Sequence, residues 1–169
     1  MKTTSKPIIK SHYIYHNNRY DVEFFEIKDD KIPDLHWSQV YAVGNLDGKV
    51  PIVKYQKSRD NLPGGGVEEG ETIEEALERE IREELNMKVL SWLPLGYQKV
   101  SDKQGNVGYQ LRVHAELEVI DKFERDPGGS VIGYDLGRLD DVNIRIQYGE
   151  VGDWLIEKVR SRYAAEPQL

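Results

Sequence analysis

The order of apolar and polar residues predicts strands on both sides of one amphipathic helix. The clearest strand covers Tyr109–Ile120, where apolar and polar residues alternate with the period of a strand that buries one face. The apolar positions are Leu111, Val113, Ala115, Leu117 and Val119, and the polar positions are Arg112, His114, Glu116 and Glu118. Further strands are predicted at Ser38–Val43, Val50–Tyr55 and Val89–Lys99. Because the turn residues Asn45–Gly48 separate the first two of these, we expect those two strands to form a hairpin.

The central helix is predicted at Ile73–Leu85 and carries signals at both ends. Thr72, with Glu75 three residues later, fits a capping box, and Asn86 tolerates the left-handed conformation in which many helices end. A second helical pattern at Asp153–Tyr163 is expected to pack on the sheet. Strands, a helix, more strands and a closing helix predict an α/β (or α+β) sandwich with a mixed sheet.

Three glutamates of the central helix lie where an amphipathic helix normally has apolar residues. At about 100° per residue, Glu80 and Glu84 fall inside the apolar arc and Glu83 falls at its border. Carboxylates this close repel one another and are costly to bury, so a positive partner is expected. Arg79 lies in a different sector of the helix and does not neutralise all three, which favours a bound Mg²⁺ or Mn²⁺ ion with oxygen ligands. The alternative is that this run is a solvated acidic face.

A glycine-rich loop precedes the acidic helix, and the two form one longer motif. Consecutive glycines can bring backbone amides close to a ligand. From Gly65 to Met87 the chain resembles the Nudix hydrolase signature, G-x5-E-x7-R-E-U-x-E-E-x-G-U, in which U is an aliphatic residue. Every fixed position matches except the last glycine, which is Asn86 here. Asparagine is the next-best residue for a left-handed helix end, so we expect this departure to do little damage.

The resemblance implies a particular fold for most of the chain. Residues 38–169 are expected to form the Nudix domain, an α/β/α sandwich with a mixed sheet. Residues 1–37 lie outside what the resemblance explains and are expected to be an N-terminal extension. Within this extension, the residues from His12 to Ile27 suggest a short hairpin around Asn17-Asn18.

The resemblance also implies a reaction and a metal site. The family hydrolyses a nucleoside diphosphate linked to another moiety, and Glu80, Glu83 and Glu84 would be the ligands of Mg²⁺. Either Glu116 or Glu118, on the downstream strand, is a candidate for a further metal-binding carboxylate, although a solvated strand face explains each of them as well. Within the motif, Glu80 and Glu83 are the candidates for the general base.

Other motif positions are expected to support this site. Glu71 and Arg79 match positions that join loop and helix by an ion pair, so they are candidate catalytic-site residues with a structural role. Lys54 and Arg59, upstream of the loop, are candidates for phosphate contacts, although exposed basic residues often serve only solubility. Backbone groups for substrate binding would come from three consecutive glycines, Gly64, Gly65 and Gly66. Base stacking or core packing is open for three aromatic residues, Trp37, Tyr97 and Tyr109.

Composition limits the possible cellular compartment and binding partners. With 30 acidic against 23 basic residues, the net charge is −7, which disfavours non-specific binding to nucleic acid or to an anionic membrane. Cysteine is absent, which excludes disulfides, thiolate metal sites and a cysteine nucleophile. The sequence shows neither a bilayer-spanning apolar run nor a signal peptide, so a cytoplasmic location without membrane contact is expected.

The leading hypothesis is therefore a Mg²⁺-dependent pyrophosphohydrolase that acts on a small nucleotide, either a nucleoside triphosphate or a nucleotide conjugate. One alternative is a non-catalytic nucleotide-binding regulatory module on the same fold, which would usually have a damaged motif. A second alternative is an RNA 5′-end or cap hydrolase, which would need a basic groove. The sequence leaves the number of metal ions open, and it is compatible with a homodimer.

Overall fold

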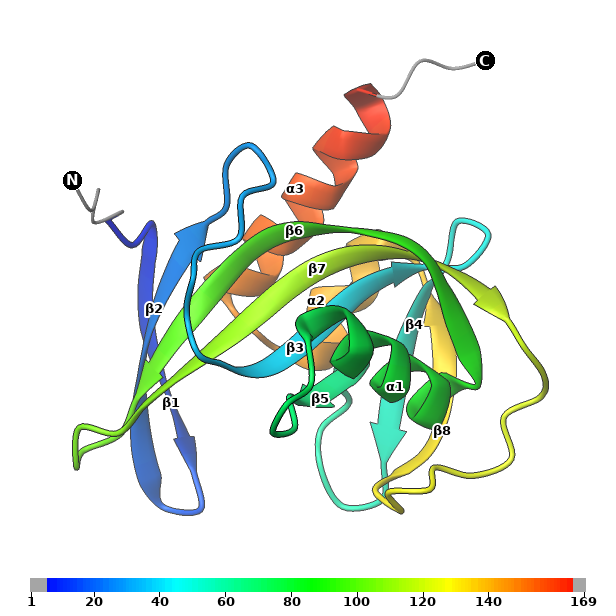
Figure 1. Ribbon diagram of the computed structural model, residues 1–169, viewed down its shortest axis with the longest axis horizontal. Coiled ribbons are helices and arrows are strands. Elements are labelled where there is room, and N and C mark those ends of the chain that lie inside the picture. Colours follow the sequence, from blue (N-terminus) through cyan, green and yellow to red (C-terminus); the bar gives the residue numbers. More distant parts are fainter. Residues whose placement is uncertain (1–5, 166–169) are drawn as a thin grey trace.

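The computed structural model describes residues 6–165, and within them the strands form one large and one small sheet (Figure 1). The large sheet has the order β1 (Ile9–Tyr15), β2 (Asn18–Glu26), β6 (Met87–Ser101), β7 (Val107–Val119), β3 (Trp37–Asn45) and β5 (Gly64–Gly66). Neighbouring strands are antiparallel except β3 and β7, which run parallel, so the sheet is mixed as predicted. The small sheet pairs β4 (Val50–Tyr55) with β8 (Val131–Gly137).

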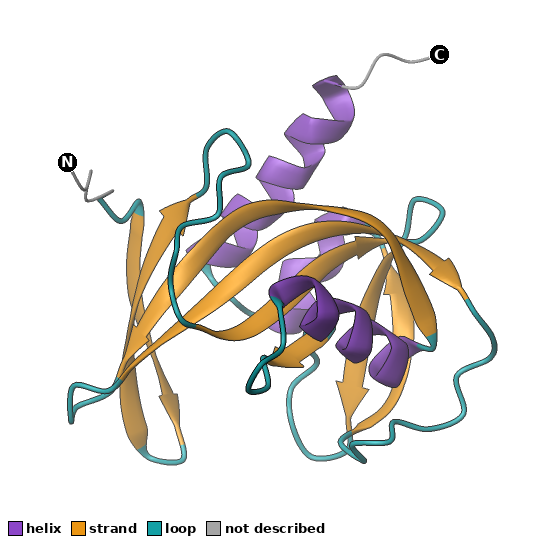
Figure 2. Cartoon of the chain, viewed as in Figure 1, coloured by secondary structure: helices purple, strands orange, loops and turns teal. Residues whose placement is uncertain are grey.

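The helices lie on opposite sides of the large sheet (Figures 1 and 2). On one face lies α1 (Ile73–Leu85), and on the other lie α2 (Val142–Ile146) and α3 (Glu150–Ala165). Each face has its own core: Leu111 packs with α1 in one, and Phe24 packs with α2 and α3 in the other. This arrangement is the predicted α/β/α sandwich. No helix among residues 6–165 is both long and apolar enough to cross a membrane.

The N-terminal residues form a hairpin that widens the large sheet. The pairing of β1 with β2 extends as far as Tyr15, which lies opposite Asn18. On its other side, β2 pairs with β6. The turn residues His16 and Asn17 have φ angles of 46° and 62°. Two left-handed residues in a row are the requirement for a tight hairpin turn that follows the natural twist of the strands. The predicted hairpin is therefore present, with its turn one residue earlier than expected.

The predicted hairpin between β3 and β4 does not form. Leu46 and Lys49 exchange both backbone hydrogen bonds, at 2.8 and 2.9 Å, but the pairing stops at this single bridge. Beyond the bridge, β4 leaves the large sheet and pairs with β8. The cause is burial: Val50 to Val53 are all buried, and Ile52 and Val53 belong to different cores. Because β4 contributes side chains to both cores, it pairs with β8 rather than with a strand of the large sheet. The strand β8 was not predicted from the sequence.

The remaining predicted elements lie close to their expected positions. The strand predicted at Val89–Lys99 extends by two residues at each end as β6, and β7 begins two residues before Tyr109. The C-terminal helix begins at Glu150, three residues earlier than expected, and its apolar residues pack on the sheet as predicted. The short helix α2 and the 3-10 turn before it, Leu139–Asp141, were not predicted.

Candidate active site

Local hydrogen bonds fix both ends of α1 and so fix where its side chains point. The Glu75 N–H donates to the Thr72 hydroxyl at 3.2 Å, and the Thr72 N–H donates to the Glu75 carboxylate at 2.8 Å, which completes the predicted capping box. Asn86 ends the helix in the left-handed conformation, with φ 53°. Ile81 and Leu85 are fully buried against the sheet. This packing sets the rotation of the helix about its axis.

Two of the three glutamates lie against the short glycine strand. Glu84 is only 5% exposed, and its Oε2 accepts the N–H of Gly64 at 2.8 Å. The glycines, which were expected to form a loop, pair with β3 as the strand β5. A Cβ atom at Gly65 would lie 2.5 Å from Oε1 of Glu80, so a side chain there would displace the carboxylate. The glycine of the motif is thus required by the close approach of the helix.

Arg79 joins the glycine strand, the loop and the helix. Its Nε and one terminal nitrogen donate to the Glu71 carboxylate at 2.8 and 3.0 Å, and the same terminal nitrogen donates to the Gly66 carbonyl at 2.8 Å. The other terminal nitrogen donates to Glu80 Oε1 at 2.9 Å and lies 3.6 Å from Glu83. Although Arg79 occupies another sector of the helix, its long side chain reaches back to two of the three carboxylates, but not to Glu84.

Burial makes two of these carboxylates unusually weak acids. Burial raises the pKa of Glu84 to about 8, against the opposing effect of the Gly64 N–H, and the carboxylates of Glu80 and Asp126 raise it further. Burial also raises the pKa of Glu80, although the hydrogen bond from Arg79 opposes this shift. Within residues 6–165 no basic side chain forms an ion pair with Glu84. A negative charge on Glu84 is therefore unfavourable until a cation joins it.

The three carboxylates fit a divalent cation by their chemistry. They offer only oxygen donors from one helix, which is the ligand type that Mg²⁺ and Mn²⁺ prefer. Within residues 6–165, however, no three acidic or histidine side chains are already arranged to hold a metal ion together. Glu80 and Glu83 are turned toward Arg79, and Glu84 toward Gly64. A cation shared by all three would replace some of these contacts.

The structure does not bring Glu116 and Glu118 to the helix carboxylates. Glu116 is 41% exposed and accepts the Asn45 side-chain amide at 2.7 Å. Glu118 is paired with Lys88 at 2.9 Å. Both lie on the face of β7 opposite Leu117, which packs in the core beneath α1. The two carboxylates are engaged on the other side of the sheet.

The two candidate basic residues differ in their surroundings. The Lys54 ammonium lies 3.6 Å from Asp135. Arg145 pairs with both Asp135 and Asp60, which places Lys54 in a network of four charges beside the small sheet. Arg59 is exposed. Lys54 therefore has a structural partner already.

The three aromatic residues considered for base stacking contact one another. The ring centroids of Trp37 and Tyr97 are 5.6 Å apart, and each lies 6.4 Å from that of Tyr109. Trp37 and Tyr97 also pack against the core beneath α1. Packing accounts for all three rings.

Asp126 is a buried carboxylate near the site that the sequence analysis did not single out. It accepts the N–H groups of Gly128 and Val131, at 2.8 and 3.0 Å, and so closes the loop before β8. Its charge contributes to the raised pKa values of Glu80 and Glu84, after the larger effect of burial, so it lies in their neighbourhood. The available signal was the run DPGGS, because an aspartate before a glycine turn commonly accepts the amides that follow.

Arg112 is a buried cation on the other face of the sheet. It is 2% exposed, and its guanidinium carbon lies 4.9 Å from the ring centroid of Tyr41 and 5.4 Å from that of Tyr148. Its terminal nitrogens donate to Gln110 Oε1 at 3.1 Å and to the Leu111 carbonyl at 3.3 Å, whereas its Nε has no partner. Among residues 6–165 no carboxylate is paired with it. The alternation of β7 placed Arg112 on the polar face but gave no sign that this face is covered.

Three comparisons relate this chain to known proteins. A family model described as "NUDIX domain" matches residues 35–155. A Nudix hydrolase from Deinococcus radiodurans is 41% identical over 76 residues, which cover 37% of this chain and 44% of the relative, so less than half of that protein is matched.

Solved structures of similar shape cover more of the chain. The Bacillus subtilis pyrophosphohydrolase BsRppH superposes with a TM-score of 0.69 and 23% identity, over 92% of this chain and 99% of that one. A NUDIX hydrolase from Nitrosomonas europaea gives a TM-score of 0.56 and 19% identity, over 75% of this chain and 90% of that one. At these identities the structures show a shared fold.

Proposed function

Since the chain belongs to the NUDIX family, we propose that it hydrolyses the diphosphate linkage of a nucleoside diphosphate joined to another group, with Mg²⁺ or Mn²⁺ as cofactor. The observation that carries this proposal is a pair of carboxylates held against the glycine strand, the buried Glu84 and the partly buried Glu80. Buried acids that lack a full set of cationic partners favour a site for a bound cation. The proposed catalytic unit is residues 38–169, with 1–37 as an extension.

Each residue of the motif has a distinct proposed role. Glu80, Glu83 and Glu84 hold the cation. When bound, the cation supplies neutralisation of the charge that develops on the diphosphate oxygens. Glu80 or Glu83 accepts the proton of the attacking water, and burial raises the pKa of Glu80 toward the range that suits a general base. Arg79, through its 2.9 Å contact, positions Glu80.

The loop before α1 completes the proposed site. Glu71 keeps Arg79 in place through paired hydrogen bonds, and the hydrogen bond from Arg79 lowers the pKa of Glu71. The backbone of Gly64–Gly66 lies beside the carboxylates and is proposed to bind the substrate's diphosphate. Arg59, which is exposed, keeps a proposed role in phosphate contact, whereas Lys54 is given none.

A substrate panel tests this proposal directly. The purified full chain is incubated with Mg²⁺ or Mn²⁺ and nucleoside triphosphates, nucleoside diphosphate sugars, dinucleoside polyphosphates or a 5′-triphosphorylated RNA, and the phosphate and nucleotide products are identified. We expect cation-dependent cleavage between two phosphorus atoms of at least one small nucleotide. The Glu83→Gln variant should lose this activity while it keeps the wild-type unfolding midpoint.

Four outcomes would contradict the proposal. Wild-type turnover in Glu83→Gln would show that Glu83 is not needed at the site. Equal turnover in excess chelator would show that no cation is needed. Binding of a nucleotide without cleavage of any substrate would favour the non-catalytic module instead. Exclusive cleavage of the RNA would favour the 5′-end hydrolase.

A further inference from the structure

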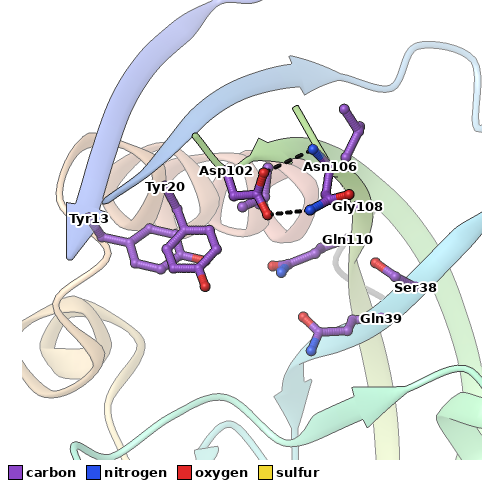
Figure 3. A pocket seen from close by; sticks show the side chains of 10 residues that line it. Tyr13, Tyr20, Ser38, Gln39, Asp102, Asn106, Gly108 and Gln110 are labelled. Carbon is purple, nitrogen blue, oxygen red and sulfur yellow. Dashed lines mark hydrogen bonds between the residues drawn. The ribbon is translucent and has the colours of Figure 1, made fainter. Parts of the chain in front are cut away.

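A hollow lies on the large sheet, on the face opposite α1. It has a volume of about 340 Å³, within the ~300–1,000 Å³ range of small-molecule pockets. The N-terminal hairpin forms one wall with Tyr13 and Tyr20, and β3 and β7 contribute Gln39 and Gln110 (Figure 3). Gln39 and Gln110 alternate with residues that pack beneath α1, so their side chains point to the opposite face.

The side chains of this pocket suit a flat, uncharged group that forms hydrogen bonds. Tyr13 and Tyr20 stack with their ring centroids 5.2 Å apart and their planes 17° apart. The Gln39 amide and the Gln110 NH₂ group make no hydrogen bond within residues 6–165, and Figure 3 shows both beside the open space. A free amide beside an aromatic ring is the combination with which proteins bind nucleobases.

The charge of the pocket argues against a phosphate inside it. Its only carboxylate is Asp102, which accepts the backbone N–H groups of Gln104 and Asn106 and the Asn106 side-chain amide. No lysine or arginine lines the pocket. A larger hollow of about 650 Å³ beside the start of α1 is lined by Glu68, Glu69 and Glu71 and repels anions still more strongly.

The pocket lies next to the proposed reaction centre. Gln39 is paired with Gly66 of the glycine strand, and Tyr41 is paired with Gly64, whose N–H binds Glu84. Two residues along a strand span about 7 Å. Because the pocket faces away from α1, a nucleotide would reach the carboxylates around the β5 edge of the sheet, where burial and, to a lesser extent, the charges of Glu84 and Glu80 raise the pKa of Tyr41.

Arg112 lies along the same path. Its guanidinium donates to Gln110, which lines the pocket, and lies over the ring of Tyr41, which neighbours the glycine strand. A buried cation without a carboxylate partner therefore lies beside the pocket, at the register of Tyr41 and Gly64. Its positive charge favours an anion bound nearby, while Tyr41 and Tyr148 cover the guanidinium itself.

The geometry points to this pocket, with the β1–β2 hairpin as one wall, as the site that binds the nucleobase of a small nucleotide substrate. The assignment rests on the proposed function for the identity of the substrate. It adds that the base is recognised by Gln39 and Gln110 and flanked by Tyr20. The hairpin lies outside residues 35–155, so substrate recognition depends on a segment beyond the matched family domain.

A binding experiment without divalent cation tests the pocket apart from catalysis. The probes are the nucleoside 5′-monophosphates AMP, GMP, CMP and UMP, with ribose 5-phosphate as the base-free control, measured by NMR titration. We expect at least one nucleotide to bind tenfold more tightly than ribose 5-phosphate. Gln39→Leu should remove this difference, whereas Gln104→Leu, in the exposed β6–β7 turn, should keep it.

A second variant, in the hairpin, shows whether a loss of binding comes from the pocket or from local unfolding. Tyr20→Leu removes the stacking surface and should also lower nucleotide affinity about tenfold, with Tyr15→Leu on the exposed part of the hairpin as its control. Unfolding midpoints identify any variant that loosens the hairpin, and Gln39→Leu, on β3, then decides. Wild-type nucleotide affinity in a folded Gln39→Leu variant would overturn the assignment.

Turnover separates the two proposals. If the wild type cleaves a nucleotide but Gln39→Leu has unchanged kcat/KM, the pocket assignment fails and the proposed function stands. If no substrate is cleaved but the base-dependent binding is present and lost in Gln39→Leu, the proposed function fails and the pocket stands. A 5′-triphosphorylated RNA that binds tenfold more tightly than every mononucleotide would overturn the choice of a small nucleotide.

Discussion

Glu84 and Arg112 are buried on opposite sides of the large sheet, and among residues 6–165 neither is paired with a side chain of opposite charge. Glu84 accepts one backbone N–H, while Arg112 donates to an amide and a carbonyl and leaves its Nε without a partner. Leaving a buried charge uncompensated costs stability. The carboxylate lacks a cation and the guanidinium lacks an anion. A bound cation would compensate the carboxylate, and an anion bound near the covered guanidinium would compensate Arg112.

The largest expected effect comes from removing the negative member of this pair. Glu84→Gln deletes a proposed cation ligand but keeps the shape of the side chain. We expect kcat to fall at least about 100-fold, equivalent to about 2.7 kcal/mol in the barrier, because the cation is no longer held. Steady-state kinetics with saturating Mg²⁺ measures this. A kcat within threefold of wild type would show that Glu84 is buried for another reason.

The same residue should make the cation-free protein sensitive to alkali. The pKa of Glu84 is raised to about 8 by burial, above its unfolded value, so the folded state binds the extra proton. The stability contribution is complete below the unfolded pKa of ~4.3 and is lost as the pH rises to about 8, with a slope of up to ~1.4 kcal/mol per pH unit.

Urea unfolding in chelator at several pH values measures this slope. The difference between wild type and Glu84→Gln should grow between pH 5 and 8, and Mg²⁺ should reduce it. Parallel pH curves for the two proteins would contradict the assignment.

Replacing Arg112, the positive member, should lower nucleotide affinity without lowering the free energy of unfolding. Arg112→Met replaces a buried, partly satisfied cation with an apolar side chain of similar length. We expect an unfolding free energy equal to wild type or higher by about 1 kcal/mol, since desolvation of the charge is avoided. Nucleotide affinity should fall about tenfold. Arg19→Met, in the exposed hairpin, is the matched control, and a strongly destabilised Arg112→Met would show that the guanidinium is a structural support.

The smallest expected effect lies at the one departure from the motif. Asn86→Gly relieves a left-handed conformation at φ 53° but loses the hydrogen bond from the Asn86 side chain to the Lys122 carbonyl at 3.0 Å. The two effects oppose each other, so the unfolding free energy should change by less than about 1 kcal/mol. Thermal unfolding measures this. A larger loss would show that the contact to Lys122 anchors the segment after β7.

Local signals account for the elements that sequence reasoning placed well. The bounds of α1 follow from Thr72, Glu75 and Asn86, which all act within one turn of a helix end. The burial of Glu84 follows from helical periodicity alone. Such features need no knowledge of distant residues, and the sequence predicted them closely.

Features that depend on distant partners were missed. Nothing near β4 indicates that its partner is β8, some eighty residues later, because the choice depends on two cores that meet around Ile52 and Val53. Arg112 was placed on the polar face of its strand, and alternation cannot show that Tyr41 and Tyr148 cover it. The pocket likewise requires the hairpin to join β6, a pairing that the sequence does not reveal.

The brevity of the glycine strand has a consequence for self-association. β5 forms one border of the large sheet and is only three residues long. A longer exposed border would present a row of unpaired amides and carbonyls on which a neighbouring chain could add a strand. A strand of three residues is too short for another chain to pair with stably. The edge of the sheet beside the carboxylates therefore resists aggregation without lysine or proline residues to block strand pairing.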